Sequence, residues 1–96
     1  VYTVPEGSLS RYLEQQTAAH AIISTFPGFR SLRTLRSAGQ PNTFADYCEW
    51  DSLADAKAAN ERAMTMPELQ IFFELGNGLI TFGHYTEHAV TPKREV

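Results

Sequence analysis

Prolines and glycines divide this chain into short segments, and their positions constrain the fold more than any other feature of the sequence. Breaks occur at Pro5-Glu6-Gly7, Pro27-Gly28, Gly39-Gln40-Pro41-Asn42, Pro67 and Gly76-Asn77-Gly78. Such residues end helices and strands, because proline lacks a backbone donor and glycine allows tight turns. The intervening segments predict a strand over 1–4, a helix over 8–25, strands over 29–37 and 43–50, a helix from 52 to Pro67, a short helix over 67–75 and a strand over 79–88.

This order predicts an α+β, ferredoxin-like βαββαβ fold: a four-stranded antiparallel sheet with both long helices on one face. Ser8 and Ser52 are the expected N-caps, and Asp55 follows Ser52 in the manner of a capping box. We expect one domain over residues 1–88 and a polar C-terminal tail over 89–96. The strands carry apolar residues on both faces, which predicts that both faces are covered. Because the helices cover one face, a second copy packed sheet to sheet would cover the other, forming a dimeric α+β barrel.

Composition excludes several functional classes. The chain has 96 residues, a net charge of −3 and eight Lys and Arg residues with no basic run, which argues against nucleic-acid binding. No stretch approaches the 18 apolar residues of a membrane span. The single cysteine cannot form an internal disulfide, and no signal peptide is visible, so we expect a cytoplasmic location.

Residues 27–56, PGFRSLRTLRSAGQPNTFADYCEWDSLADA, resemble the antibiotic biosynthesis monooxygenase family of dimeric α+β barrels. The matching features are Pro-Gly-Phe before the second strand, Arg36-Ser37 at the hairpin exit, a proline before the third strand, and Trp50-Asp51-Ser52 entering the second helix. The resemblance implies the same fold and a homodimer. For the polyketide monooxygenases of this family it implies oxidation of an electron-rich phenolic substrate without metal or flavin.

In those enzymes an Asn and a Trp stand four residues apart on the third strand, and some members add a Tyr six residues later. Trp50 matches the Trp, whereas Asp46 stands at the Asn position and Ala56 at the Tyr position. An aspartate cannot donate an amide hydrogen bond to an oxyanion, but it can accept a proton. The haem-degrading branch matches less well, because its helical Trp and His fall at Ala59 and near Leu69.

Trp50, Asp46 and Cys48 share one face of the third strand, and this face lines a pocket if it looks toward the helices. Trp50 would then offer a stacking surface, and Asp46 a carboxylate that acts on a substrate hydroxyl. The alternative is that Trp50 is a core anchor and that Asp46 pairs with an arginine such as Arg33. Cys48 is expected to be buried and inert, because no basic neighbour lowers its pKa.

Polar residues interrupt the expected inner faces of both long helices. Gln16 and His20 interrupt the stripe Leu9, Leu13, Gln16, His20 and Ile23, and Asn60 interrupts the stripe Leu53, Ala56, Asn60 and Met64. Buried without partners, each group would cost about 1–3 kcal/mol. They therefore bond one another or a strand group, or they line a polar pocket.

His84 alternates with Ile80, Phe82 and His88 on the predicted last strand. His84 and His88 are two strand steps apart, about 13 Å, which is too far for one metal ion. His20 and His84 across the gap between helices and sheet lack a placed third ligand, so no metal site is predicted.

The predicted function is a cofactor-independent monooxygenase-like enzyme acting on a small aromatic or quinol-like compound. Its candidate catalytic residues are Trp50, Asp46 and His20, and its candidate substrate-binding residues are Gln16, Asn60, Cys48 and His84. One alternative is a non-catalytic dimeric module of the same fold that binds a small ligand or only assembles. Another is an isomerase or lyase that uses His20 or His84 as a base.

Overall fold

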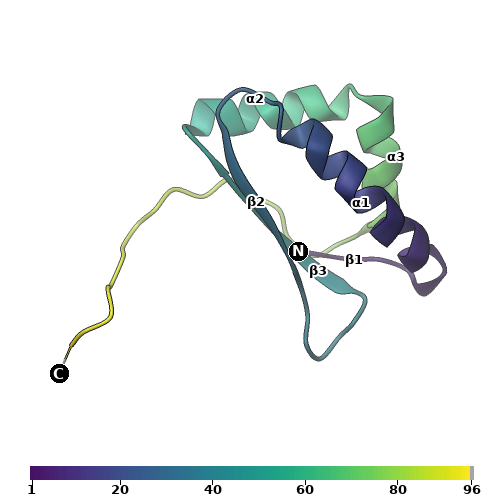
Figure 1. Cartoon of the computed structure of the whole chain (residues 1–96), viewed down its shortest axis with the longest axis horizontal. Helices are drawn as coiled ribbons and strands as arrows, with labels where there is room; N and C mark the ends of the chain where they lie inside the picture. Colours follow the sequence, from purple (N-terminus) through teal and green to yellow (C-terminus); the bar gives the residue numbers. More distant parts are fainter. Residues whose placement is uncertain (96) are drawn as a thin grey trace.

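The computed structural model describes residues 1–95, and its elements follow the predicted order (Figure 1). They are listed here in chain order: β1 (Tyr2–Thr3), a 3-10 turn (Glu6–Ser8), α1 (Leu9–Ile23), β2 (Phe29–Arg36), β3 (Thr43–Trp50), α2 (Leu53–Met64), α3 (Pro67–Leu75) and β4 (Gly78–Leu79). The strands form one antiparallel sheet in the order β2-β3-β1-β4. The α+β, ferredoxin-like prediction is therefore confirmed.

The β2–β3 hairpin is the longest part of the sheet, and the helices lie together on one side of it (Figure 1). Gly28 starts the hairpin with a φ of 79°, a conformation that suits glycine. The Gly28 carbonyl accepts a hydrogen bond from the backbone N–H of Asp51 at 2.8 Å, which ties the entry of β2 to the exit of β3.

The two predicted N-caps differ. The Ser52 hydroxyl accepts a hydrogen bond from the Asp55 N–H at 3.1 Å and donates one to the Asp55 carboxylate at 2.9 Å, so this cap is confirmed. Ser8 precedes α1 but makes no side-chain cap bond, because a 3-10 turn leads directly into the helix. Ser8 therefore occupies the predicted N-cap position but contributes no side-chain cap bond.

The core lies between the helices and the sheet, and one aromatic cluster occupies much of it. The buried residues are Val4, Tyr12, Ala19, Phe26, Phe44, Ala59, Ala63, Leu69 and Phe72. The Tyr12 ring lies 4.8 Å from that of Phe44 and 5.2 Å from that of Phe72, between centroids. Contacts of this kind stabilise a core beyond the area that they bury.

The buried faces of α1 and α2 are each rotated by about one residue from the predicted stripes. Tyr12 is 1% exposed whereas its neighbour Leu13 is 42% exposed, and in α2 Ala59 and Ala63 are buried whereas Met64 is 65% exposed. The reason is steric, because the small alanines of α2 allow close packing and Tyr12 fills the space above the sheet. His20 and Asn60 consequently lie at the edge of the core, half-buried, instead of at its centre.

The predicted last strand over 79–88 is wrong in length. β4 has two residues, because its neighbour β1 also has only two and offers no further partner in the described chain. Residues 80–95 have no regular secondary structure, and the end of this segment leaves the body of the molecule (Figure 1). The tail predicted over 89–96 remains a prediction, and its last residue lies outside the described residues.

Candidate functional site

A groove of about 1280 Å³ lies beside β3, between the helices and the segment that follows β4. Six of the seven predicted site residues line it: His20, Asp46, Cys48, Trp50, Asn60 and His84. Gln16, the seventh, is half-buried on α1 but does not line the groove. The groove thus brings together six of the residues predicted for the site, and Gln16 lies outside it.

Asp46 is the centre of a hydrogen-bond network at one end of this groove. Its Oδ1 accepts a hydrogen bond from the Thr34 hydroxyl at 2.7 Å, and its Oδ2 accepts one from the Tyr2 hydroxyl at 3.0 Å. Thr34 faces Asp46 directly in the register of the β2–β3 hairpin. The suggested pairing of Asp46 with Arg33 is wrong, because Arg33 lies on the opposite face with its guanidinium 5.7 Å from the Tyr47 ring centroid.

The directions of the hydrogen bonds follow from the number of protons available. Tyr2 has one hydroxyl proton, which it donates to Asp46, so in the bond between the Tyr2 and Tyr12 hydroxyls Tyr12 is the donor. Thr34 likewise donates to Asp46, so its oxygen can only accept from Nε2 of His20, which lies 3.5 Å away. Every donor in the network therefore points, directly or through one hydroxyl, toward the Asp46 carboxylate.

Burial keeps the two tyrosines of this network neutral. The pKa of Tyr2 is raised far above its usual value, mainly by burial and further by its hydrogen bond with Tyr12 and by the charge of Asp46. Burial also raises the pKa of Tyr12. Both phenols therefore remain hydrogen-bond donors across the physiological pH range. A carboxylate offers about four acceptor positions, so Asp46 can accept a further proton donor from the groove.

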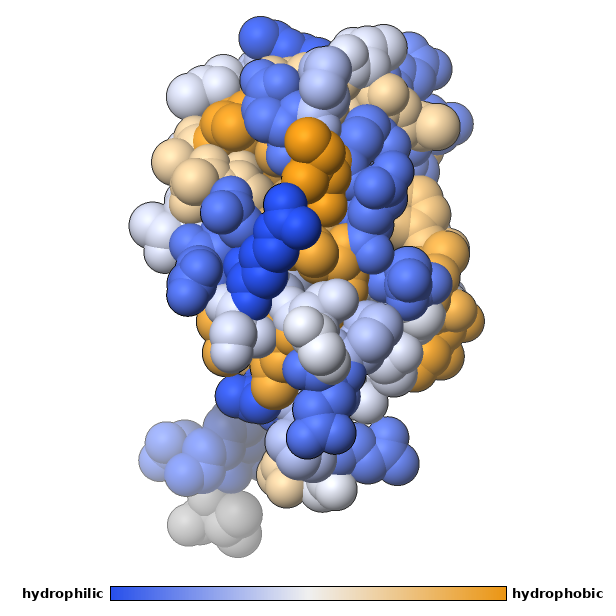
Figure 2. Space-filling model, turned by 90° about the vertical axis from the view of Figure 1, so that its right-hand side faces the viewer, coloured by the Kyte–Doolittle hydropathy of each residue, from blue (hydrophilic) through white to orange (hydrophobic). Residues whose placement is uncertain are grey.

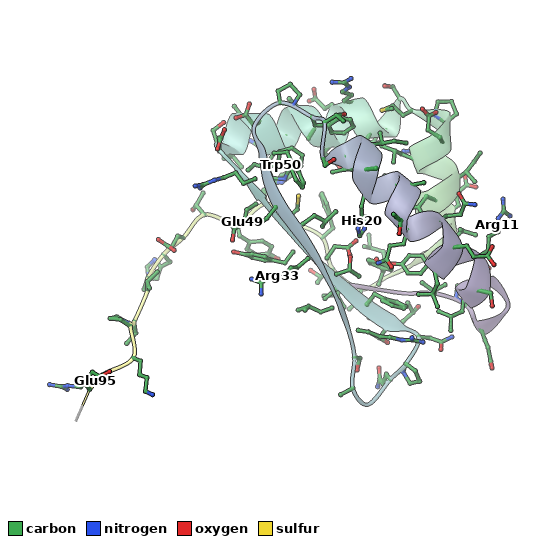
Figure 3. All side chains as sticks on the ribbon, viewed as in Figure 1. Arg11, His20, Arg33, Glu49, Trp50 and Glu95 are labelled. Atoms are coloured by element: carbon green, nitrogen blue, oxygen red, sulfur yellow. The ribbon has the colours of Figure 1, made fainter. Side chains whose placement is uncertain are left out.

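Trp50 lies at the other end of the groove, at the end of β3. Its ring is half-buried, packs against the core and meets the Phe29 ring edge to face, with centroids 5.6 Å apart. Figure 3 shows Trp50 below α2 and His20 pointing from α1 toward the hairpin. Trp50 thus anchors the β3–α2 corner and also forms part of the groove wall, and its role as a stacking surface stays a prediction.

The remaining lining residues are partly apolar and partly polar. Burial, reinforced by the charges of Asp46 and Glu49, raises the pKa of the Cys48 thiol to about 11, so Cys48 is a poor nucleophile at neutral pH. The amide of Asn60 contacts the sulfur of Met64 at 3.9 Å. His84 enters from the segment after β4, with its ring 5.4 Å from that of Phe82. Among residues 1–95, no group of three or more His, Cys, Asp or Glu side chains is arranged to hold a metal ion.

The sequence did not identify three residues of the Asp46 network: Tyr2, Tyr12 and Thr34. Thr34 could have been found by aligning the predicted hairpin, since its turn places residue 34 opposite residue 46. Tyr2 shares the face of Phe44 through the pairing of β1 with β3. Tyr12 was not recognised, because the leucines of α1 were assigned to its buried face.

A smaller pocket of about 130 Å³ lies elsewhere, between α2 and the loop before β2. Phe26, Pro27 and Arg62 are among its lining residues, and the guanidinium of Arg62 covers the Phe26 ring at 4.8 Å. It is lined by none of the predicted site residues. None of the helices in the described part of the chain is long and apolar enough to cross a membrane.

No curated protein and no solved structure matches this chain. The comparison with protein families, in contrast, matches residues 1–65 to the family described as antibiotic biosynthesis monooxygenase. The matched region runs from β1 to the end of α2 and contains the whole Asp46 network together with Cys48, Trp50 and Asn60. The match covers most of the 96 residues and agrees with the strand order, and the chain therefore belongs to the antibiotic biosynthesis monooxygenase family.

Proposed function

We propose that this protein is a cofactor-independent oxygenase that acts on a small phenolic or quinol-like aromatic compound bound in the groove. The observation that carries this proposal is the Asp46 carboxylate, which faces the groove and is held by the hydroxyls of Tyr2 and Thr34. The family supports a monooxygenase-like or small-molecule-binding protein in general terms. The substrate class and the roles of the residues are our inference.

In this proposal Asp46 accepts the proton of the substrate hydroxyl as a general base. The resulting phenolate is electron-rich and passes electrons to molecular oxygen, a carbon–oxygen bond forms on the ring, and water leaves. The overall balance is one phenol and one oxygen molecule giving one quinone and one water. The Tyr2 and Thr34 hydroxyls hold the carboxylate in place, and His20 restrains Thr34 from the α1 side.

Trp50 lies at the other end of the groove, about 13 Å along the strand from Asp46, so it would stack on a remote ring of a multi-ring substrate whose hydroxyl reaches Asp46. Cys48 lies between them on the same face of β3 and adds an apolar surface. Asn60 and His84 would supply hydrogen bonds from the α2 side and from the segment after β4. Gln16 has no part in this proposal, because it does not line the groove.

Oxygen uptake with a panel of phenols and hydroquinones tests the catalytic proposal. Asp46→Asn keeps the size of the side chain but removes the base, so we expect kcat to fall by about 10²–10⁴-fold with any substrate that is turned over. Glu14→Gln is the matched control, since Glu14 is an exposed carboxylate on α1 outside the groove, and it should leave kcat unchanged. Equal rates for Asp46→Asn and the parent chain would exclude Asp46 as the base.

The second part of the site is tested with Trp50→Phe. Because phenylalanine keeps the corner filled but offers a smaller ring, we expect KM to rise severalfold with a smaller change in kcat. A variant with unchanged KM would show that Trp50 is only a structural anchor.

We also propose that the protein is a homodimer formed by the outer face of the sheet. No helix within residues 1–95 covers that face, and it exposes Leu35 and Tyr47 at 55% and 52%. The helical side differs, because Figure 2 shows its apolar patches separated by polar side chains over α1 and α3. Leu35→Lys should weaken dimerisation in sedimentation experiments, whereas Met64→Lys on α2 should not. If both variants sediment like the parent chain, the outer face is not the interface.

A second candidate is a non-catalytic binding module for a similar aromatic ligand. It is favoured by Ala56, which lines the groove where the resemblance would place a reactive tyrosine. Quenching of the fluorescence of Trp50, the single tryptophan, by phenols without oxygen uptake would support this reading. The cytoplasmic location stays a prediction from the cysteine content.

A further inference from the structure

The two methionines of the chain are close in sequence but lie in different surroundings. Among residues 1–95, Met66 packs against the core at the start of α3, whereas Met64, the last residue of α2, is 65% exposed and lies outside the core cluster. Oxidation of a thioether by peroxides depends on the access of the oxidant to the sulfur. Met64 is therefore the methionine that an oxidant in solution reaches first.

The sulfur of Met64 also contacts a residue of the groove. A side-chain N–H of Asn60, one helical turn earlier on α2, donates to this sulfur at 3.9 Å. Asn60 lines the groove, and Met64 lies outside its lining. Because a thioether sulfur is a weak acceptor, this contact holds the amide of Asn60 weakly. The exposed sulfur is thus linked to the candidate site through a single amide.

We propose that Met64 is a site of oxidative modification, and that its sulfoxide fixes the side-chain amide of Asn60 at the groove wall. Hydrogen peroxide is the oxidant: its O–O bond breaks, one oxygen atom bonds to the sulfur, and the other leaves as water. The sulfur loses two electrons and the peroxide gains them. The product is a polar sulfoxide, whose oxygen accepts the same N–H of Asn60 more strongly than the sulfur does.

This modification changes the groove without removing core contacts. Met64 lies outside the core cluster, so a polar oxygen on its sulfur disturbs less packing than the same change at Met66. The amide of Asn60 has two N–H donors, and the sulfoxide engages one of them. A ligand in the groove then meets an amide of fixed orientation with one donor fewer. Only this last step rests on the proposed function, because it takes the groove as the binding site.

Peroxide treatment of two variants measures each methionine separately. Both variants carry Cys48→Ala, so that methionine supplies the only sulfur atoms of the chain. One adds Met66→Leu and the other adds Met64→Leu, changes that nearly conserve side-chain volume. Mass spectrometry of the intact chain follows the gain of one oxygen atom. We expect Met64, in the Met66→Leu chain, to oxidise at least about threefold faster than Met66 in the Met64→Leu chain.

NMR of the asparagine side chains tests the link between the sulfoxide and the groove. In the Met66→Leu chain, oxidation of Met64 should shift a side-chain N–H signal of Asn60 downfield, because oxygen replaces sulfur as the acceptor. Asn42 and Asn77, the other two asparagines, are internal controls whose signals should not move. Treatment with the two methionine sulfoxide reductases, one for each sulfoxide epimer, should return the Asn60 signal to its first position.

Two outcomes would overturn the proposal. The first is an equal rate of oxidation for Met64 and Met66. The second is an Asn60 signal that stays in place after oxidation of Met64, or that moves together with those of Asn42 and Asn77, because the sulfoxide would then act on the whole fold. Neither measurement needs a ligand or turnover, so a failure here is distinguishable from a failure of the Asp46→Asn assay.

Discussion

The two edges of β3 are built differently. Toward β2 the strand is paired along most of its length through a hairpin whose turn is only a few residues long. Toward β1 it is paired at two positions, and that partner is about forty residues away in the sequence. A local hairpin loses less chain entropy on closure than a distant strand pair does. The edge of β3 that pairs with β2, the closed edge, therefore contributes most of the stability of the sheet. The groove with the candidate site residues lies along the other edge, toward β1, which we call the open edge.

Phe44 belongs to the fully paired part of β3, so its truncation should give the largest effect. It is 3% exposed and contacts Tyr2 and Tyr12. Phe44→Ala should lower the free energy of unfolding by about 3–5 kcal/mol. Phe82→Ala, the same change at a site 63% exposed beside the open edge, should stay within about 0.5 kcal/mol in urea denaturation. Similar losses for both would mean that the segment after β4 packs as firmly as the hairpin.

A substitution at the entry of the hairpin should give the next largest loss of stability. Gly28 has a φ of 79°, and a Cβ there would overlap with the Asp55 side chain. Gly28→Ala should cost about 1–3 kcal/mol through backbone strain and displacement of Asp55. Gly39→Ala in the hairpin turn has open space around it and should cost much less. Thermal melts of the two variants give the comparison, and equal melting temperatures would contradict it.

Removing the helix cap at the exit of the hairpin into α2 should lower the free energy of unfolding somewhat less. Ser52→Ala removes the hydroxyl that accepts from Asp55 N–H and should cost about 1 kcal/mol. Ser8→Ala, at the start of α1, removes no cap bond and should change the free energy of unfolding little. A larger loss at Ser8 than at Ser52 would reverse the assignment of the two caps.

The smallest expected effect is a pH dependence at the open edge. The pKa of Cys48 is about 11 in the folded chain, against an ordinary value of 9.0, so the folded state keeps its proton where the unfolded state has lost it. The stability that this group contributes is complete below pH 9 and is lost as the pH rises toward 11. Urea titrations of the parent chain and Cys48→Ala between pH 8 and 10.5 should therefore converge as the pH rises. A constant difference would mean that the thiol is not held neutral by burial.

Several features of the fold followed from the sequence, because local chemistry determines them. The bounds of β3 and α3 were predicted as found, since turn residues and Pro67 mark their ends. The order of strands followed from the order of segments. Asp46, Cys48 and Trp50 line one groove, because they alternate along β3 and therefore share one face of the strand.

What could not be predicted depends on contacts between distant segments. The length of the last strand was wrong, since alternation in the sequence says nothing about whether a partner strand is present beside it. The predicted buried faces of α1 and α2 were wrong by about one residue. Tyr12 and the alanines of α2 are buried because of their shape, which a hydropathy pattern does not describe. The sequence identified only part of the Asp46 network for the same reason, because its donors come from β1, β2 and, through Tyr2, α1.

The position of the Val1 amino group has a practical consequence for expression and assay. It donates to the Thr81 carbonyl at one end of the groove, so any affinity tag fused there would begin at the candidate site and could occupy it. The yellow end of the described chain instead leaves the body of the molecule (Figure 1). Activity and ligand binding are therefore best measured with the tag at the carboxyl end, or with an amino-terminal tag removed without residual residues.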